Sequence, residues 1–308
     1  ETPKLEKGFI RVKHIYSLVS AGTECLKLEG KMGKVENSSV GYSGVGMVVD
    51  GMEGTSFNLG DFVFTRERHA DIVDVPHNIA EKQFIKVDKE FAKEATFLEL
   101  GKVAMHGLHR VEVKIGDWII VFGLGIVGNL AAQLARLATG KKVIGVEPIM
   151  KRRSIAESLG ITTIDPREKE FVRKIMNLTD NNGVEICLET SGSQQALNQA
   201  MEISSLRGQI SIIAGHYGIR ELDLKTHFQN KELSLIGARR LELTEKSMED
   251  RWTVTECKKE IYRMIKWKDI QVDPLITHVV KPEEAPEVYK SLLNKDESML
   301  GVIFSWDN

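Results

Sequence analysis

The sequence predicts an α/β fold with two domains, of which one is rich in β-strands and the other contains a doubly wound parallel sheet. The 308 residues are 42% hydrophobic and 28% charged, an ordinary composition for a globular protein of about two domains. Residues 1–90 contain short apolar runs separated by turns. From about residue 93, strand-like apolar runs alternate with segments of helical periodicity, which is typical of a parallel sheet built from β-α-β units.

The N-terminal part reads as strands and turns. Residues 8–19 predict a strand, because apolar residues recur there at alternating and continuous positions. Residues 20–24 (SAGTE) and 41–46 (GYSGVG) read as connections, and 47–49 (MVV) as a second strand. Residues 58–64 (NLGDFVF) predict a glycine turn into a third strand. We therefore expect a small β domain here.

The middle of the chain predicts a regular alternation of elements. Helices are expected at 93–113, 129–140, 152–160, 170–179 and 194–205, and strands at the start of 117–128 and at 141–148, 162–165, 183–192, 208–215 and 232–238. The tail does not continue the alternation tightly, so we expect it to return to the first domain; its predicted elements are a helix near 256–267, a strand at 276–280, a helix at 282–294 and a strand at 301–306.

Composition excludes several classes of function. Lys and Arg number 42 and Asp and Glu 44, a net charge of −2, which argues against a dedicated nucleic-acid binder. No apolar run approaches the ~18–20 residues of a membrane span, and the first residues lack a secretory signal pattern. Cys25, Cys187 and Cys257 are too few and too far apart for a disulfide framework or a structural zinc site. A reducing cytoplasm is the expected compartment.

A glycine-rich turn carries the strongest functional signal. Gly123, Gly125 and Gly128 form GxGxxG, directly after an apolar strand and before a helix, and Ile126 and Val127 within the motif are further candidates for cofactor contact. In a dinucleotide-binding turn, the first glycine permits the tight turn and the second lets the backbone approach a pyrophosphate. The third lets helix and strand pack closely. The alternative is a tight turn without a ligand.

The position of an acidic residue indicates which dinucleotide is bound. Glu147 follows Gly128 by 19 residues and ends the next strand, where a carboxylate accepts hydrogen bonds from the adenosine ribose hydroxyls and repels a 2′-phosphate. This favours NAD, although Arg152 and Arg153 could accommodate that phosphate, so NADP stays open. Two further candidates for cofactor contact lie at the ends of later strands, Gly215 and Ala238.

The chain resembles the medium-chain dehydrogenases/reductases over essentially its whole length. The matching segments are 20–24, 41–46, 60–64, 99–110, 123–128, 146–147 and the GARR turn at 237–240. The resemblance implies a GroES-like catalytic domain over residues 1–97 and 241–308 and a Rossmann nucleotide-binding domain over 98–240. It also implies homodimers or homotetramers, formed through the nucleotide domain with 234–238 as an edge strand.

Departures from the zinc-dependent family members are informative. Ala21 stands where those enzymes have a ligand cysteine, and Tyr42 and Ser43 stand where they have a ligand histidine and glutamate. Their four-cysteine structural lobe is missing, because no cysteine lies between Phe64 and Glu99. A catalytic zinc needs three side-chain donors, so we expect no metal. This pattern resembles a metal-free branch associated with sugar substrates and related to bacteriochlorophyllide dehydrogenase.

The resemblance also suggests groups that replace the metal. Thr23 matches the hydroxyl that binds the reacting oxygen, and Glu99 matches a carboxylate of the polyol enzymes. Tyr42 would act as the acid/base, and Lys102, three residues after Glu99 on one helix face, would lower the pKa of Tyr42 or hold the substrate oxygen.

Each candidate also has a structural interpretation. Thr23 could be a turn hydroxyl, Tyr42 could fill the volume left by the metal, and Glu99 and Lys102 could form a solvated ion pair. Three other groups are weighed in the same way: His106 and Cys25 are expected to be structural, whereas His216 and Tyr217 either touch substrate or are ordinary loop residues.

The expected function is an NAD-dependent, zinc-independent oxidoreductase that interconverts a secondary alcohol and a ketone on a sugar, polyol or cyclitol. The hydride would move in the cleft between the two domains. One alternative is an enoyl or quinone reductase, which usually prefers NADPH. Another is a nucleotide-binding protein without catalysis.

Overall fold

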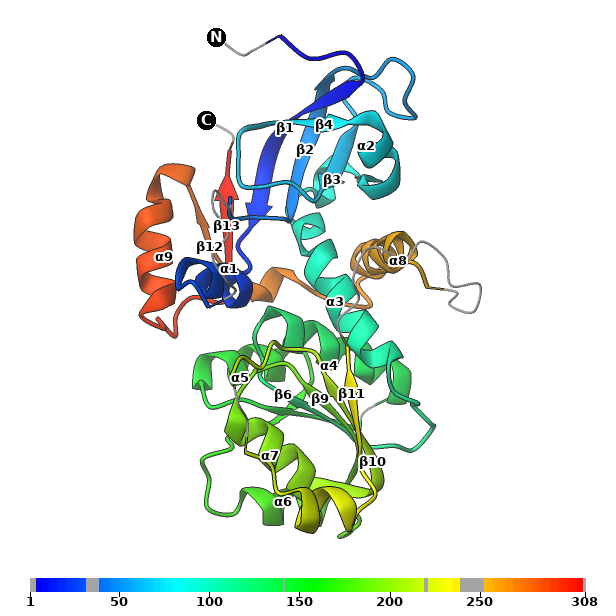
Figure 1. The fold of residues 1–308 in the computed structure, drawn as a ribbon, viewed down its shortest axis with the longest axis vertical. Helices are drawn as coiled ribbons and strands as arrows, with labels where there is room; N and C mark the ends of the chain where they lie inside the picture. Colours follow the sequence, from blue (N-terminus) through cyan, green and yellow to red (C-terminus); the bar gives the residue numbers. More distant parts are fainter. Residues whose placement is uncertain (1–3, 32–38, 141, 219–220, 239–251, 307–308) are drawn as a thin grey trace. The chain divides into compact units, whose positions relative to one another are not determined.

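The computed structural model describes residues 4–31, 39–140, 142–218, 221–238 and 252–306 (Figure 1). The chain divides into two compact units, one of residues 1–99 and 246–308 and the other of 100–245. Helix α3 (Leu98–His109) spans the first of these boundaries. The boundary expected at 240/241 and the end of the GARR segment lie outside the described residues.

The described strands of the first unit form a seven-stranded, mostly antiparallel sheet. Their order is β12-β13-β1-β2-β3-β5, with β4 also paired to β1. The strands are β1 (Phe9–Leu18), β2 (Gly44–Asp50), β3 (Phe62–Thr65), β4 (Ile72–Pro76), β5 (Ile85–Lys86), β12 (Ile276–Val280) and β13 (Gly301–Ser305).

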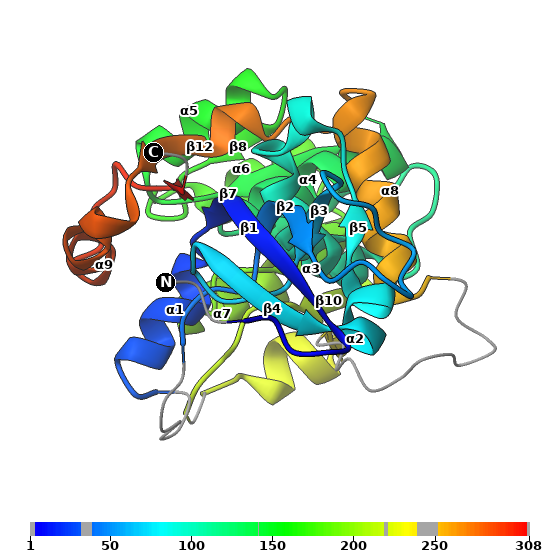
Figure 2. The same ribbon diagram turned by 90° about the horizontal axis from the view of Figure 1, so that it is seen from above.

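Strand β1 organises this sheet, because it pairs with three others. It runs antiparallel to β2, to β13 and to β4, which lies alongside it in Figure 2. Ile10 and Val12 of β1 pack with Val48 of β2 and Phe57 in a buried cluster. The C-terminal strands β12 and β13 are parallel neighbours, so the tail of the chain completes a sheet that the N-terminus begins.

Helices of the first unit include two that the sequence pattern does not indicate. The helices are α1 (Ala21–Leu28), α2 (His77–Gln83), α8 (Val254–Lys266) and α9 (Ala285–Leu293). The interpretation of residues 20–24 as a connection is wrong, because they begin α1. That helix is only 8 residues long and contains Gly22 and Thr23, so its propensity and periodicity give a weak signal.

The second unit contains the predicted parallel sheet, which confirms the fold class. Its described strands run in the order β11-β10-β9-β6-β7-β8, and every pair is parallel. The strands are β6 (Ile119–Phe122), β7 (Val143–Val146), β8 (Thr162–Ile164), β9 (Val184–Glu189), β10 (Ser204–Ile212) and β11 (Ser234–Gly237).

The helices of this unit follow the predicted alternation with shifted ends. They are α4 (Ile126–Thr139), α5 (Met150–Ser158), α6 (Phe171–Leu178) and α7 (Gln194–Ile203), with a short π-helix at Leu224–Gln229. Helix α4 begins inside the glycine motif rather than after it. Residues 204–207, divided between a predicted helix and a connection, belong to β10.

The strand order defines where a ligand fits this sheet. The chain passes from β6 to β7 and β8 on one side, and then returns to β9, β10 and β11 on the other. In open parallel sheets, ligands bind outside the carboxyl ends of the strands at such a reversal. The reversal lies between β6 and β9. Among the described residues, no helix has both the length and the apolar character needed to cross a membrane.

Candidate functional site

The glycine turn lies at the carboxyl end of β6, and at two of its positions the backbone leaves no room for a residue other than glycine. Gly123 has a φ of +85°, a conformation that favours glycine, and its N–H donates to the carbonyl of Val146 over 2.8 Å. A Cβ on Gly128 would lie 1.8 Å from the carbonyl oxygen of Gly123. Thr190 Oγ1 donates to that same oxygen at 2.9 Å, so β9 contributes to the turn. Both glycines are required by the packing of the turn.

Gly125 differs from the other two glycines. It is the N-cap of α4 with a φ of −64°, and a Cβ placed there would meet nothing within 4 Å. No side chain caps the helix, so its first N–H groups face the open space above Gly125. A helix N-terminus of this kind attracts anions through its N–H groups and its dipole. The cradle fits a dinucleotide pyrophosphate.

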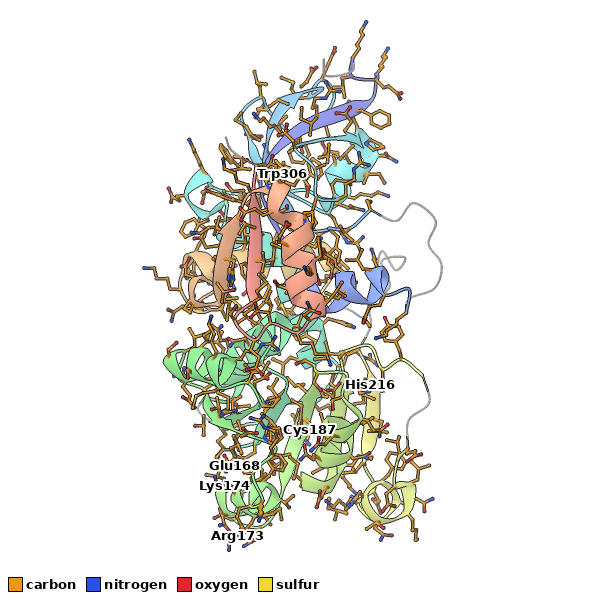
Figure 3. The ribbon with its side chains drawn as sticks, turned by 90° about the vertical axis from the view of Figure 1, so that its left-hand side faces the viewer. Glu168, Arg173, Lys174, Cys187, His216 and Trp306 are labelled. Atoms are coloured by element: carbon orange, nitrogen blue, oxygen red, sulfur yellow. The ribbon has the colours of Figure 1, made fainter. Side chains whose placement is uncertain are left out.

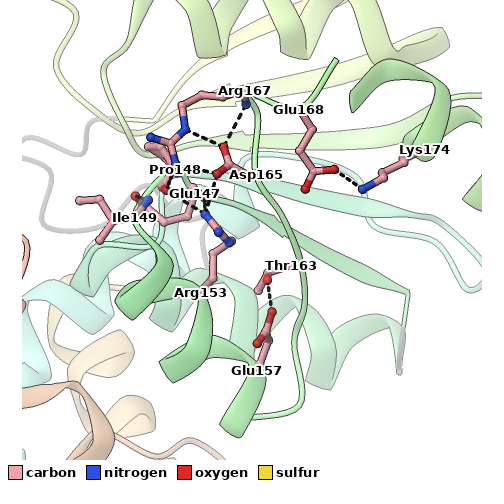
Figure 4. Close-up of polar contacts among 10 residues, drawn as sticks. All are labelled: Glu147, Pro148, Ile149, Arg153, Glu157, Thr163, Asp165, Arg167, Glu168 and Lys174. Carbon is pink, nitrogen blue, oxygen red and sulfur yellow. Dashed lines mark hydrogen bonds and ion pairs between the residues drawn. The ribbon is translucent and has the colours of Figure 1, made fainter. Parts of the chain in front are cut away.

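Glu147 lies at the end of β7 and is only 3% exposed. Its carboxylate accepts hydrogen bonds from the N–H groups of Leu124 (2.7 Å) and Ile149 (3.0 Å), which fixes it beside the glycine turn. Arg152 approaches this carboxylate at 4.0 Å, and its buried Nε has no hydrogen-bond partner among the described residues. Arg153 instead bonds the carbonyls of Glu147 and Pro148 and the carboxylate of Asp165 (Figure 4). Arg152 is therefore the arginine that faces the Glu147 carboxylate.

A buried carboxylate at the end of β9 was missed by sequence reasoning. Glu189 is fully buried and accepts hydrogen bonds from the N–H groups of Ser191 (2.8 Å) and Gly192 (3.0 Å) and from the Ser191 hydroxyl. His216, labelled in Figure 3, approaches the same carboxylate through Nε2 at 2.7 Å. The only signal in the sequence is that Glu189 lies near the end of the predicted strand 183–192 and His216 follows the predicted strand 208–215.

The remaining residues proposed for this edge are placed as follows. Gly215 precedes His216, and the Tyr217 ring covers it so closely that a Cβ would meet the ring at 2.7 Å. Tyr217 itself is 37% exposed. Ala238 directly follows β11 and donates its N–H to the carbonyl of Ile212 in β10. These residues lie at the same edge of the sheet as the glycine turn.

In the first unit, Tyr42 belongs to a hydroxyl cluster at the start of α1. Its phenol donates a hydrogen bond to Ser20 Oγ, and Thr23 is a second hydrogen-bond neighbour. Burial raises the pKa of Tyr42, and the two hydrogen bonds lower it by less. The negative charges of Glu24 and Glu99 add to the increase. Burial sets the direction of this shift, and no lysine is among the groups that cause it.

A second buried carboxylate supports this cluster. Glu24 is fully buried and accepts hydrogen bonds from Ser20 N–H (2.9 Å), from His69 Nε2 (3.2 Å) and from the Tyr289 hydroxyl of α9. Burial alone would raise its pKa, but the bonds from His69, Tyr289 and Ser20 outweigh burial and lower it. Glu24 stays ionised and holds the first turn of α1, including Thr23, in place.

Glu99 lies in a cluster of cations rather than in solvent. It is 3% exposed and pairs with Lys258 Nζ at 2.7 Å and Arg66 Nε at 3.3 Å. Lys258 belongs to α8 and is itself 2% exposed, with Nζ 4.9 Å above the centre of the Phe64 ring. Lys102 is also buried. The solvated ion pair considered for Glu99 and Lys102 is therefore excluded. His106 and Cys25 are half-buried, on α3 and α1.

Comparisons with known proteins show similarity to dehydrogenases. The model of the zinc-binding dehydrogenase family matches residues 127–254. D-guloside 3-dehydrogenase of Escherichia coli is 29% identical over 220 residues, which cover 69% of this chain and 62% of that protein. The 2-dehydro-3-deoxy-L-galactonate 5-dehydrogenase of Pseudoalteromonas atlantica is 31% identical over 147 residues, covering 48% and 42%. In sequence the chain is therefore similar to zinc-type dehydrogenases, including sugar dehydrogenases. The alignments span less than two thirds of the length of these relatives.

Solved structures of dehydrogenases share the fold over nearly the whole chain. The (2R,3R)-butanediol dehydrogenase of Bacillus subtilis aligns with a TM-score of 0.81 at 21% identity, covering all of this chain and 95% of that one. Galactitol-1-phosphate dehydrogenase of E. coli aligns with a TM-score of 0.82 at 18% identity, covering 99% and 95%. At these identities the likeness establishes the fold alone.

The donor set of this protein does not fit a catalytic zinc. Ala21 offers no donor atom, and the raised pKa of Tyr42 keeps its phenol protonated at neutral pH. The Ser43 hydroxyl donates to the carbonyl of Thr96 at 2.5 Å, and Glu99 is paired with Lys258. Within the described ranges, no three His, Cys, Asp or Glu side chains gather as a metal ion requires. The matched segment, 127–254, includes none of the positions 21, 42, 43 and 99.

Proposed function

We propose that the protein is an NAD-dependent, zinc-independent oxidoreductase that interconverts a secondary alcohol and a ketone on a polar substrate. One observation carries the proposal. The chain has a tight glycine turn of the dinucleotide-binding type. Where zinc-dependent relatives have metal ligands, it has instead a cluster of hydroxyl groups that includes Tyr42. Alcohol chemistry in such a protein needs proton donors and acceptors from its own side chains.

The preference for NAD rests on Glu147. Its buried carboxylate is fixed by two backbone N–H groups beside the glycine turn, where it would accept the ribose hydroxyls. A 2′-phosphate there would face a negative charge, with Arg152 as the compensating cation nearby. Bound nicotinamide supplies the hydride chemistry, and the protein supplies position and electrostatics.

Tyr42 is the acid in this proposal. Because burial raises its pKa, it remains a phenol at neutral pH and can donate to the oxygen of a carbonyl or a developing alkoxide. Thr23, held on α1 by the Glu24 network, would bind the same oxygen. We also propose that the buried cations Lys258 and Lys102 stabilise negative charge on that oxygen, with Glu99 fixing Lys258.

We propose a sugar, polyol or cyclitol as the substrate. The relatives are named for polyhydroxylated substrates, D-guloside and 2-dehydro-3-deoxy-L-galactonate. An enoyl or quinone reductase is the second candidate, because a tyrosine with a raised pKa is a better proton donor than acceptor. That activity would be detected with NADPH rather than NAD.

Two further proposals concern the oligomeric state and the cellular compartment. Strand β11 occupies the edge of the parallel sheet, and an edge strand offers unpaired N–H and carbonyl groups to a second copy. We propose a homodimer or homotetramer formed there. Cys25, Cys187 and Cys257 are free thiols, which suits a reducing cytoplasm.

The first test is turnover in the presence of a chelator. The purified protein is incubated with NAD and with sorbitol, galactitol, 2,3-butanediol and myo-inositol, and reduced nicotinamide is followed by absorbance. We expect a chelator-resistant signal with at least one polyol. A signal abolished by the chelator would overturn zinc independence. Binding of NADH without turnover of any substrate would favour a reductase or a non-catalytic protein.

Tyr42 is tested by Tyr42→Phe, which removes only the hydroxyl. We expect kcat to fall by ~10²–10⁴-fold, because a positioned acid contributes about that much, with NADH affinity unchanged. Tyr16→Phe, on β1 of the same unit, is the control and keeps wild-type kcat. Wild-type kcat in Tyr42→Phe would show that Tyr42 only fills space.

A further inference from the structure

One edge of strand β1 is shared by two other strands. Strand β2 pairs along one edge of β1, whereas β13 and β4 follow one another along the other edge. The pairing passes from β13 to β4 between Tyr16, which lies opposite Ser305, and Lys13, which lies opposite Ile72. Strand β13 therefore ends, and β4 begins, opposite the middle of β1. Side chains from these strand ends gather around one point.

A pocket of about 190 Å³ lies at this junction. Lys13 of β1 and Asp71, just before β4, line one part of it, and Ser305 and Trp306 at the end of β13 line another. Residues 281–283 form the third wall, because β12 runs parallel to β13 and ends beside it. All of these residues belong to the first unit. Sites for drug-sized ligands measure ~300–1,000 Å³, so this pocket suits a smaller molecule.

Trp306, labelled in Figure 3, gives the pocket an aromatic wall that is held in place. Its backbone N–H donates to the carbonyl of Ile15 at 2.8 Å, and its indole Nε1 donates to Ser17 Oγ at 2.9 Å. The ring also meets that of Phe304 edge to face, with the centroids 6.5 Å apart. Because the indole N–H is used inside the protein, the ring offers a ligand apolar surface rather than a donor.

The charged groups of the pocket are balanced. Lys13 and Lys281 face the same space as Asp71 and Glu283. Within the part of the chain that the structure describes, none of these four side chains belongs to an ion pair. Ammonium groups only donate hydrogen bonds, and ionised carboxylates only accept them. An anion would meet two carboxylates and a cation would meet two ammonium groups, whereas a neutral molecule with several hydroxyls can bond to both kinds at once.

We propose that this pocket is an accessory binding site for a neutral sugar, of about one pyranose ring. The sugar hydroxyls donate to Asp71 and Glu283 and accept from Lys13 and Lys281, and the apolar C–H groups of the ring lie against Trp306. No reaction takes place there. The inference goes beyond the proposed function, because the pocket shares no residue with the glycine turn or with the hydroxyl cluster of Tyr42. Binding therefore needs no NAD.

The competing interpretation is a gap between strand ends that only water fills. Fluorine NMR of protein labelled with 5-fluorotryptophan separates the two, because the chain has four tryptophans and Trp306 lines the pocket. The Trp306 signal is assigned from its loss in Trp306→Phe. The probes are methyl α-D-glucopyranoside, methyl α-D-galactopyranoside and methyl α-D-mannopyranoside, with inorganic phosphate as the anionic comparison. We expect at least one glycoside to shift the Trp306 signal saturably without NAD, and phosphate to leave it unmoved.

Two substitutions at exposed positions test the charged groups. Lys281→Met and Asp71→Ala should each weaken glycoside binding by ~10-fold or more, because each removes hydrogen bonds to a charged group. Their melting temperatures should stay at wild type. Lys290→Met, at an exposed position on α9 of the same unit, is the matched control and should bind like wild type. The kcat and KM for polyol oxidation should be unchanged in Lys281→Met.

The outcomes separate this inference from the proposed function. A Trp306 signal that no glycoside moves overturns the site, and a shift with phosphate alone overturns its preference for a neutral sugar. Equal glycoside affinities of Lys281→Met and Lys290→Met also overturn it. Polyol turnover with an unmoved Trp306 signal overturns only this inference. A glycoside-dependent shift in a protein that turns over no substrate supports the pocket and overturns only the proposed function.

Discussion

Buried charges are the features of single residues that most shape this protein. Glu99 and Lys258 are far apart in the sequence. They come from α3 and α8 and pair only in the folded protein, where each is less than 5% exposed. Removing water from a carboxylate and an ammonium costs several kcal/mol for each ion, which their attraction offsets only while both are present. Each partner therefore depends on the other.

Lys258→Met tests this dependence. The substitution removes the ammonium partner of the buried Glu99 carboxylate, so the free energy of unfolding should fall by ~3 kcal/mol in urea titrations. Lys259→Met is the matched control, because Lys259 is exposed and its pair with Glu256 contributes at most ~0.5 kcal/mol. Adding Glu99→Leu to Lys258→Met should recover most of the loss. Equal effects of the two lysine substitutions would contradict this account.

Among the elements, the start of helix α4 shows most directly how the glycine motif of the sequence relates to the structure. Two glycines there have opposite surroundings. Gly128 packs against the backbone of the turn, whereas Gly125 borders open space. Gly128 is therefore needed for the fold, whereas the space beside Gly125 is open to a ligand.

Gly125→Ala and Gly128→Ala form a matched pair. Gly128→Ala should lower the melting temperature by several degrees, because its Cβ would lie 1.8 Å from a backbone oxygen. Gly125→Ala should melt like wild type but bind NADH at least tenfold more weakly, because the new methyl group occupies the anion cradle. Differential scanning fluorimetry and NADH fluorescence measure the two properties. Wild-type NADH affinity in Gly125→Ala would place the cofactor elsewhere.

For the whole molecule, pH enters stability through a buried histidine. Burial lowers the pKa of His14 to about 4, more than the bond to the Ala70 carbonyl raises it, and the charge of His69 lowers it further. The unfolded chain therefore binds more protons than the folded one between pH 6.5 and 4. The stability contributed by neutral His14 is complete above about pH 6.5 and is lost as the pH falls towards 4.

His14→Gln tests this dependence. In wild type, the free energy of unfolding should decrease by ~3 kcal/mol through this group between pH 6.5 and 4. The variant keeps a donor and an acceptor for Ala70 and Thr65 but does not titrate, so its stability curve should be flatter over that range. Urea unfolding at several pH values measures both curves, and parallel curves would refute the assignment.

Regular elements with strong periodicity were predictable from the sequence, and short irregular ones were not. The apolar strands and amphipathic helices between residues 117 and 238 predicted the parallel sheet and the glycine turn at its carboxyl edge. Helices α1 and α2 and strands β4 and β5 were missed. Each is 8 residues or shorter, too short for a period to stand out.

The sequence by itself determined the fold class and predicted the glycine turn, because these depend on local patterns. The absence of metal ligands at positions 21, 42 and 43 was predicted from the resemblance to the zinc-dependent enzymes. Only the tertiary structure decided which charged groups meet: Lys258 with Glu99, His216 with Glu189, and Tyr289 and His69 with Glu24. These partners come from different strands and helices. Their pairing follows from strand order and helix packing, which local periodicity does not encode.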